Sequence, residues 1–166
     1  MTFTRSMESP IGTITLCSDR DYIIGLAFEE ERHPRDRSGA IAGPTDVLLE
    51  AERQIEEYFD GARKSFDIPL RPQGTAFQER VWQQLLAIPF GQTISYLELA
   101  RRIGNEKAVR AVAMANGRNP IGLIIPCHRV IGSNGDLTGY GGGLPRKEYL
   151  LKHEGARHRG EQPSLF

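Results

Sequence analysis

The segment NPIGLIIPCHRV, residues 119–130, carries a cysteine at the end of an apolar run. The run from Ile121 to Ile125 must be buried, so Pro126 and Cys127 are expected on a rigid stem. Neighbouring side chains of an extended segment point in opposite directions. His128 is therefore expected to reach Cys127 only through a bent backbone or a bridging water.

Cys127 has two interpretations when it is considered alone. Free cysteines are among the most buried residue types, which favours a structural thiol. The thiolate is the reactive form, and a free cysteine titrates near pH 8.5, so a nucleophile needs a neighbouring base or positive charge. His128 and Arg129 follow directly and are the candidates. A lone Cys-His pair does not decide between the two interpretations.

The chain beyond this segment contains a turn, a glycine run and a helix. Residues 133–136 have the composition of a turn, and residues 138–143 contain four glycines around Tyr140. Such a run either lets the backbone wrap a flat ligand or serves as a flexible linker. Residues 145–153 then form an expected short amphipathic helix, which Glu154 follows.

The chain before this segment predicts three helices. Thr75 and Gln78 form a capping-box pattern ahead of an apolar stripe at helical spacing, and a Pro-Phe-Gly turn at 89–91 closes that helix. Ser95 with Glu98 opens a second helix by the same pattern. A glycine turn at 104 then leads into a helix over 106–116. This order, helix, glycine turn, helix, is typical of a helix-turn-helix.

The second helix of that pair is rich in alanine and has two interpretations. Lys107 and Arg110 project among small residues that include Ala111. Alanine is a good helix former, so these residues could simply pack on a neighbouring element. Alternatively, their small size lets the helix lie in a groove of DNA.

The first third of the chain predicts a small antiparallel sheet with one helix. Residues 13–17 and 22–28 have strand patterns separated by a charged turn, and residues 46–59 have helical spacing. Residues 29–44 are expected to form a loop, residues 66–70 a further strand, and residues 71–74 a linker. The fold class is therefore α/β, with an amino-terminal domain over residues 1–73 and a mainly helical, winged-helix-like domain over residues 74–166.

Composition limits the classes of protein to consider. Residues 1–73 hold 9 Lys and Arg against 14 Asp and Glu, and residues 74–166 hold 12 against 7, so only the second half suits a polyanion. Cys17 and Cys127 lie far apart without metal-ligand spacing, so neither a metal site nor a disulfide is expected. No apolar run could cross a bilayer and the start lacks a signal peptide, which predicts a cytoplasmic protein with no membrane association.

Two long stretches resemble a known family. Residues 119–155, NPIGLIIPCHRVIGSNGDLTGYGGGLPRKEYLLKHEG, and residues 77–104, FQERVWQQLLAIPFGQTISYLELARRIG, are similar to the O6-alkylguanine-DNA alkyltransferases, also called methylated-DNA-protein-cysteine methyltransferases. The segment SPIGTITL, residues 9–16, resembles their amino-terminal domain more faintly. The motif PCHRV in this setting is highly specific.

The resemblance implies a single-use DNA repair protein. Cys127 matches the residue that takes the alkyl group from O6 of guanine, His128 the residue that accepts its proton through a water, and Glu154 the carboxylate that orients the histidine. Asn119 matches the residue that braces the loop before the cysteine. O4-alkylthymine is a second candidate substrate. The resemblance implies no cofactor and a monomeric protein acting on double-stranded DNA.

The resemblance also implies a DNA-binding surface and a base pocket. Arg110 matches the arginine that fills the duplex stack in place of the flipped guanine, and Tyr96 the tyrosine that crowds the adjacent phosphate. Lys107 and Ala111 belong to the same DNA-facing helix. The implied pocket for the extruded base comprises Pro126, Val130, Tyr140 and Gly141, with the Tyr140 hydroxyl as a proton donor to the leaving guanine.

One departure from the family concerns the pocket. Gly141 stands where other members have a larger residue, so bulkier alkyl groups are expected to fit.

Two alternative functions, from other classes of protein, remain open. A non-catalytic module that recognises alkylated bases would need no nucleophile. A cysteine hydrolase would use the same three residues and turn over.

Overall fold

The computed structural model describes residues 1–31 and 34–156, which divide into two compact units. Unit 1 consists of Met1–Gln73 together with Pro120–Ile124, and unit 2 consists of Gly74–Asn119 with the chain from Ile125 onward. Residues 157–166 of the expected second domain, and two residues of the expected loop over 29–44, lie outside the described residues. The excursion of residues 120–124 into unit 1 has no counterpart in the sequence-based division.

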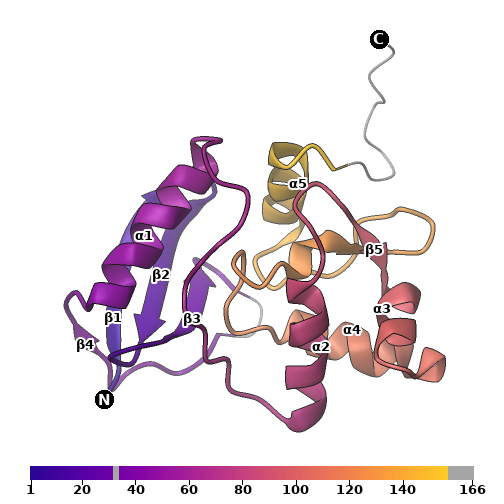
Figure 1. Cartoon of the computed structure of the whole chain (residues 1–166), viewed down its shortest axis with the longest axis horizontal. Coiled ribbons are helices and arrows are strands. Elements are labelled where there is room, and N and C mark those ends of the chain that lie inside the picture. Colours follow the sequence, from indigo (N-terminus) through magenta and orange to yellow (C-terminus); the bar gives the residue numbers. More distant parts are fainter. Residues whose placement is uncertain (32–33, 157–166) are drawn as a thin grey trace. The chain divides into compact units, whose positions relative to one another are not determined.

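Unit 1 is a four-stranded sheet with one long helix (Figure 1). The strand order is β3-β2-β1-β4; β1–β2 and β2–β3 are antiparallel, and β4 pairs parallel with β1. The elements are β1 (Phe3–Ser9), β2 (Gly12–Ser18), β3 (Ile23–Phe28), β4 (Ile41–Ala42) and α1 (Asp46–Phe59). The predicted hairpin and the predicted helix are therefore confirmed, whereas β1 and β4 were not predicted.

Alternation along the strands and spacing along the helix build the core of unit 1. The Thr45 hydroxyl accepts a hydrogen bond from Leu48 N at 3.2 Å and so fixes the start of α1. The helix contacts β1, β2 and β3. The buried apolar side chains of the strands and the helix include Ile14, Leu16, Ile23, Leu26, Leu48, Ala51, Ile55 and Tyr58.

The prediction of a strand over residues 66–70 is wrong. Leu70 forms only an isolated bridge with Ile23, through Ile23 N to Pro69 O at 2.9 Å and Arg71 N to Ile23 O at 2.8 Å. Pro69 has no backbone N–H, so the ladder cannot continue through it.

The apolar run before the cysteine joins unit 1. Leu26 N donates to Pro120 O at 2.9 Å, and Leu26 bridges Ile121. The apolar residues of the run are buried as expected. The run is not a strand, because Leu123 has a left-handed backbone with φ of 68°.

Unit 2 is mainly helical (Figure 1). Its helices are α2 (Ala76–Leu86), α3 (Tyr96–Arg102), α4 (Val109–Gly117) and α5 (Leu144–His153), and its 3₁₀ turns are η1 (Glu106–Ala108) and η2 (Cys127–Arg129). Two short strands, β5 (Ile94–Ser95) and β6 (Val130–Ile131), pair in parallel. The helix predicted over 106–116 therefore begins as a 3₁₀ turn before it becomes α4.

Capping residues fix where helices of unit 2 begin, and a buried tryptophan joins two of them. Thr75 and Gln78 complete both hydrogen bonds of the predicted capping box, and Ser95 Oγ accepts from Glu98 N at 3.0 Å. Trp82 of α2 donates its indole N–H to Ala115 O at 2.9 Å. α4 thus packs on α2 through Ala115, as the packing interpretation of the alanines expects, while Ala111 is exposed.

Across residues 1–31 and 34–156, no helix is long and apolar enough to cross a membrane.

Candidate active site

Cys127 lies in a tight 3₁₀ turn and not on an extended stem. Arg129 N donates to Pro126 O at 3.0 Å, and Cys127 N donates to Ile125 O at 2.8 Å. The side chain of Cys127 is buried, with 5% exposure. The backbone is therefore bent at this point, which is one of the two conditions under which His128 was expected to approach Cys127.

A buried carboxylate joins His128 to Arg129. Glu154, directly after α5, accepts from His128 Nε2 at 2.9 Å through Oε2. Arg129 Nε donates to Glu154 Oε1 at 2.8 Å and Arg129 Nη2 donates to Glu154 Oε2 at 3.0 Å. The two residues therefore form a bidentate ion pair. Arg129 Nη1 also donates to Ile88 O at 2.6 Å. Arg129 thus anchors the carboxylate, a role that sequence reasoning did not assign to it.

The electrostatics of this cluster keep the histidine neutral and the carboxylate charged. Complete burial lowers the pKa of His128, and the hydrogen bond and charge of Glu154 offset this only in part. Burial by itself raises the pKa of Glu154, but the hydrogen bonds from His128 and Arg129 and the positive charge of Arg129 outweigh it and hold that pKa well below its ordinary value. The cluster therefore carries its charge on Glu154 and Arg129.

Glu154 determines which ring nitrogen of the neutral His128 carries the hydrogen. Glu154 Oε2 can only accept, so Nε2 carries the hydrogen and Nδ1 presents a lone pair. Nδ1 is buried and makes no hydrogen bond within the part of the chain that the structure describes. A basic nitrogen is thus available on the residue adjacent to Cys127.

Two asparagines hold the backbone around the cysteine. Asn119 Nδ2 donates to Ile125 O at 2.8 Å, which fits the predicted bracing of the loop before the cysteine. Asn116 Nδ2 donates to Cys127 O at 3.4 Å. Asn116 is the last buried residue of α4, and sequence reasoning overlooked it because nothing in the helical pattern separates it from a surface asparagine.

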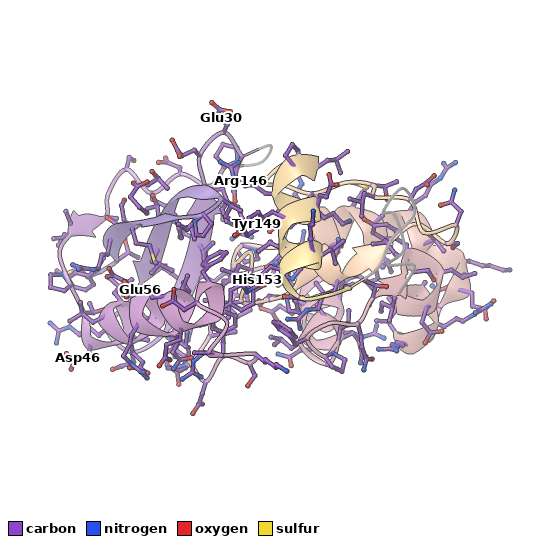
Figure 2. The ribbon with its side chains drawn as sticks, turned by 90° about the horizontal axis from the view of Figure 1, so that it is seen from above. Glu30, Asp46, Glu56, Arg146, Tyr149 and His153 are labelled. Carbon is purple, nitrogen blue, oxygen red and sulfur yellow. The ribbon has the colours of Figure 1, made fainter. Side chains whose placement is uncertain are left out.

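Lys147 is a second residue that sequence reasoning overlooked. Its side chain is fully buried, and Nζ donates to Val130 O at 2.6 Å and Thr138 O at 2.7 Å. Burial lowers the pKa of Lys147 to about 8, against the opposing effect of a negative charge on Cys127. Figure 2 shows Arg146, Tyr149 and His153 projecting along α5, whereas the buried positions of this helix are Lys147, Leu150 and Leu151. The position of Lys147 three residues before Leu150 places it on the inward face of α5, but this spacing does not show which partners its ammonium finds.

The two tyrosines of the predicted site both lie in this region. Tyr96 Oη donates to Thr138 O at 2.9 Å, and burial raises the pKa of Tyr96, with a charge on Cys127 acting in the same direction. Tyr140 is buried, and its ring stands edge-on to His128 with centroids 6.5 Å apart. Of the other predicted pocket residues, Pro126 and Val130 are buried and Gly141 is partly exposed.

The predicted DNA-facing residues lie on the surface of unit 2. Lys107 in η1 and Arg110 and Ala111 in α4 are all exposed, in contrast to the buried cysteine cluster. The helices before and after the turn at Gly104 are α3 and α4, and Gly104 has φ of 85°, as the glycine turn required.

Within residues 1–31 and 34–156, no three His, Cys, Asp or Glu side chains are grouped so as to hold a metal ion. Cys17 is buried on β2.

Two family models match the chain. The model described as "6-O-methylguanine DNA methyltransferase, ribonuclease-like domain" matches residues 3–72, and the model described as "6-O-methylguanine DNA methyltransferase, DNA binding domain" matches residues 76–156. The chain belongs to the 6-O-methylguanine DNA methyltransferase family. The predicted resemblance is therefore confirmed, and it extends to unit 1, where the sequence carried it only faintly.

Individual members of this methyltransferase family are similar over nearly the whole chain. A methylated-DNA–protein-cysteine methyltransferase of Methanosarcina acetivorans is 50% identical over 149 residues, which cover 90% of this chain and 96% of that protein. The crystal structure of Mycobacterium tuberculosis O6-methylguanine methyltransferase is 44% identical, covers 97% of both chains and has a TM-score of 0.87. A structure of the M. tuberculosis protein in complex with DNA has the same TM-score, with 95% of this chain covered. These relatives confirm the predicted α/β fold class.

Proposed function

We propose that this protein repairs O6-alkylguanine in double-stranded DNA by moving the alkyl group irreversibly to Cys127. The observation that carries the proposal is the unprotonated Nδ1 of His128, held in place by Glu154 and adjacent to a cysteine in a bent turn. Membership of the methyltransferase family supports the same reaction. Each protein molecule repairs one lesion.

The chemistry follows from the residues around Cys127. His128 Nδ1 takes the thiol proton through a water, and Glu154 stabilises the resulting imidazolium. The sulfur then forms a bond to the alkyl carbon as the bond from that carbon to O6 of guanine breaks. The electron pair of the broken bond stays on guanine, which takes a proton from the Tyr140 hydroxyl. The product is a thioether that water does not cleave at neutral pH.

The alkyl carbon must leave the duplex to meet the sulfur, because O6 of guanine lies inside the stack. We assign this step to a helix-turn-helix made of α3 and α4. Arg110 is exposed on α4 and suits the role of filling the gap that the extruded guanine leaves. Lys107 and Ala111 contact the same groove, and Tyr96 crowds the neighbouring phosphate. Phosphate contacts make this binding salt-sensitive and only weakly dependent on sequence.

The extruded base is assigned to a pocket beside Cys127. Its walls are Pro126, Val130, Tyr140 and Gly141. Asn119 and Asn116 hold the backbone carbonyls on either side of Pro126, which supports a pocket whose shape is fixed before DNA arrives. O4-alkylthymine is a second candidate for the same pocket.

The wider setting of the protein is also a proposal. Residues 1–73 act as a supporting domain and residues 74–166 as the DNA-binding and alkyl-accepting domain. The protein works as a monomer in the cytoplasm and needs no metal or cofactor.

The test is mass spectrometry after incubation with one equivalent of duplex DNA carrying O6-methylguanine. The expected result is a stoichiometric gain of one methyl group, located on Cys127 by peptide mapping, and no gain in Cys127→Ala. DNA binding by Cys127→Ala should stay close to that of the wild type. No methyl transfer would favour a non-catalytic binder, and continued release of methyl groups would favour a hydrolase; either result contradicts the proposal.

A further inference from the structure

The guanidinium of Arg129 is held between Glu154 and the turn that follows α2. Nε and Nη2 donate to the two oxygens of Glu154, and Nη1 donates to Ile88 O at 2.6 Å. The Cζ atom also lies 5.9 Å from the centre of the Phe90 ring. Arg129 is buried, with 7% exposure. These contacts fix the position of a positive charge relative to the carboxylate that orients His128.

The buried group of His128, Glu154 and Arg129 is electrically neutral as a whole. The side chains of His128 and Glu154 are completely shielded from solvent. The carboxylate of Glu154 is balanced by the guanidinium, and the imidazole carries no charge. Without the guanidinium, the carboxylate would be a buried charge with no counter-charge bonded to it, which is costly. The pair of His128 and Glu154 would then take up a proton, because protonation cancels that charge.

The other groups beside His128 do not replace Arg129 in this role. They are Lys147 of α5, Cys127 of η2 and the edge-on ring of Tyr140. Burial lowers the pKa of His128 most, and the charges of Arg129 and Lys147 lower it further. Lys147 Nζ donates to the backbone carbonyls of Val130 and Thr138, whereas Arg129 bonds the carboxylate itself.

An extra proton on the pair removes the base whichever residue binds it. A proton on His128 goes to Nδ1, because Nε2 already carries the hydrogen that it donates to Glu154. A proton on Glu154 makes the carboxyl a donor to Nε2, and the ring hydrogen must then reside on Nδ1. In both cases Nδ1 has lost its lone pair and cannot accept the proton of Cys127.

We infer that Arg129 is a positioning residue that keeps a single proton on the pair of His128 and Glu154, so that Nδ1 of His128 stays a base at neutral pH. This inference rests on the proposed function, because it concerns the base that activates Cys127. It gives Arg129 a role beyond anchoring the carboxylate, since the guanidinium then sets the pH range in which the thiol is activated. Lysine at this position would keep the charge and lose the bidentate geometry.

The first test observes the ring nitrogens of His128 by ¹⁵N NMR in histidine-labelled protein without DNA. The chain has four histidines, and the His128 signals are those that disappear in His128→Asn. At neutral pH, Nδ1 should have the chemical shift of an unprotonated nitrogen in the wild type and in Arg129→Lys. In Arg129→Met it should have the shift of a protonated nitrogen. Any other pattern overturns the inference.

The second test measures the single-turnover rate of methyl transfer from saturating duplex DNA carrying O6-methylguanine, as a function of pH. In Arg129→Met the acid limb of the profile should move up by at least about one pH unit, so the rate near about pH 6.5 should fall at least about tenfold. Arg129→Lys should slow transfer by a similar factor at every pH and leave the acid limb in place. A merely structural Arg129 would give this uniform loss in Arg129→Met as well, which would overturn the inference.

The controls keep the test decisive. Arg53→Met makes the same change at an exposed position of α1 and should keep the wild-type profile. If Arg129→Met does not fold, Arg129→Gln replaces it, because its amide still donates to Glu154 without a charge, and it should show the same protonated Nδ1. A protonated Nδ1 in the wild type overturns the inference without any variant. Transfer by Arg129→Met with an unmoved acid limb overturns only this inference, whereas no transfer by the wild type overturns the proposed function.

Discussion

His128 Nε2 lies 2.9 Å from Glu154 Oε2, although 26 positions separate the two residues along the chain. The same carboxylate receives two hydrogen bonds from Arg129, so one acidic side chain orients the imidazole and neutralises a buried guanidinium. Because η2 and α5 supply the partners, the geometry of the histidine depends on how α5 ends.

Glu154→Gln should therefore lower both stability and reactivity. The substitution leaves the buried Arg129 without its counter-charge, which costs about 3–5 kcal/mol of unfolding free energy. The introduced amide could also donate to His128 Nε2 and favour the wrong tautomer, so the methyl-transfer rate should fall at least about a hundredfold. Urea unfolding and single-turnover transfer measure the two effects. Glu148→Gln is an exposed change on α5 and serves as the control. It should change the unfolding free energy by no more than about 0.5 kcal/mol and leave the transfer rate close to that of the wild type. Equal losses in both variants would contradict the role assigned to Glu154.

The pH dependence of stability should report the neutral state of His128. Burial holds the pKa of His128 below its ordinary value in the folded chain, so the unfolded chain binds this proton more readily. Stability should consequently rise with pH up to about 6.5 and gain nothing further from this group above it. Urea unfolding between about pH 5.5 and 7.5, above the range where Glu154 titrates, should show a smaller slope in His128→Asn than in the wild type. An equal slope in His128→Asn and the wild type would contradict a lowered pKa of His128.

Local signals were enough to predict the α-helices and two of the three longer strands, β2 and β3. Thr45, Thr75 and Ser95 cap the helices that follow them, and α1 has the bounds that its apolar spacing predicted. The strands β4, β5 and β6 span two residues each and carry no periodicity. β1 was missed because only Met7 among its seven residues is buried, so the strand shows no apolar alternation.

The site was predictable only where a motif marks it. The motif around Cys127 made the cysteine and histidine candidates, and the family resemblance added Glu154, which the structure hydrogen-bonds to His128. Asn116 and Lys147 were missed because their burial depends on partners that the chain brings from elsewhere, Cys127 O for Asn116 and Val130 O for Lys147. No spacing rule shows that a polar side chain will find such partners.

Lys147→Met should reduce the reactivity of the Cys127 thiol. A thiolate at Cys127 raises the pKa of Lys147 against the larger effect of burial, so by reciprocity the Lys147 ammonium favours the thiolate. Loss of this charge should slow modification by iodoacetamide at pH 7 about tenfold, measured in a Cys17→Ser background. The difference from wild type should shrink above pH 8, since the pKa of Lys147 is about 8. Lys152→Met on the same helix serves as the exposed control, and a slowing of equal size there would argue against the mechanism.

Arg110→Ala should impair repair of duplex DNA specifically. Without a side chain to fill the stack, extrusion of the base loses a stabilisation of about 1–3 kcal/mol, so transfer from a duplex lesion should slow at least about tenfold. A single-stranded oligonucleotide with the same lesion needs no extrusion and should react at nearly the wild-type rate. Single-turnover rates on both substrates make the comparison. Arg53→Ala replaces an exposed arginine of α1 and should leave both transfer rates unchanged. If Arg110→Ala slowed transfer from the duplex and from the single strand equally, the stack-filling role would be ruled out.

Gly141→Ser should narrow the range of alkyl groups that the pocket accepts. A Cβ at Gly141 would meet Gly117 O at 3.7 Å, an ordinary contact, and the backbone there is not left-handed, so the fold should tolerate serine. In the proposed base pocket, the added side chain would occupy space that a benzyl group needs more than a methyl group does. The rate on O6-benzylguanine relative to O6-methylguanine should therefore fall about tenfold, with an unchanged melting temperature. Gly39→Ser, which has open space around it in unit 1, should keep the wild-type ratio. Equal ratios in wild type and Gly141→Ser would show that this position does not set the accepted alkyl size.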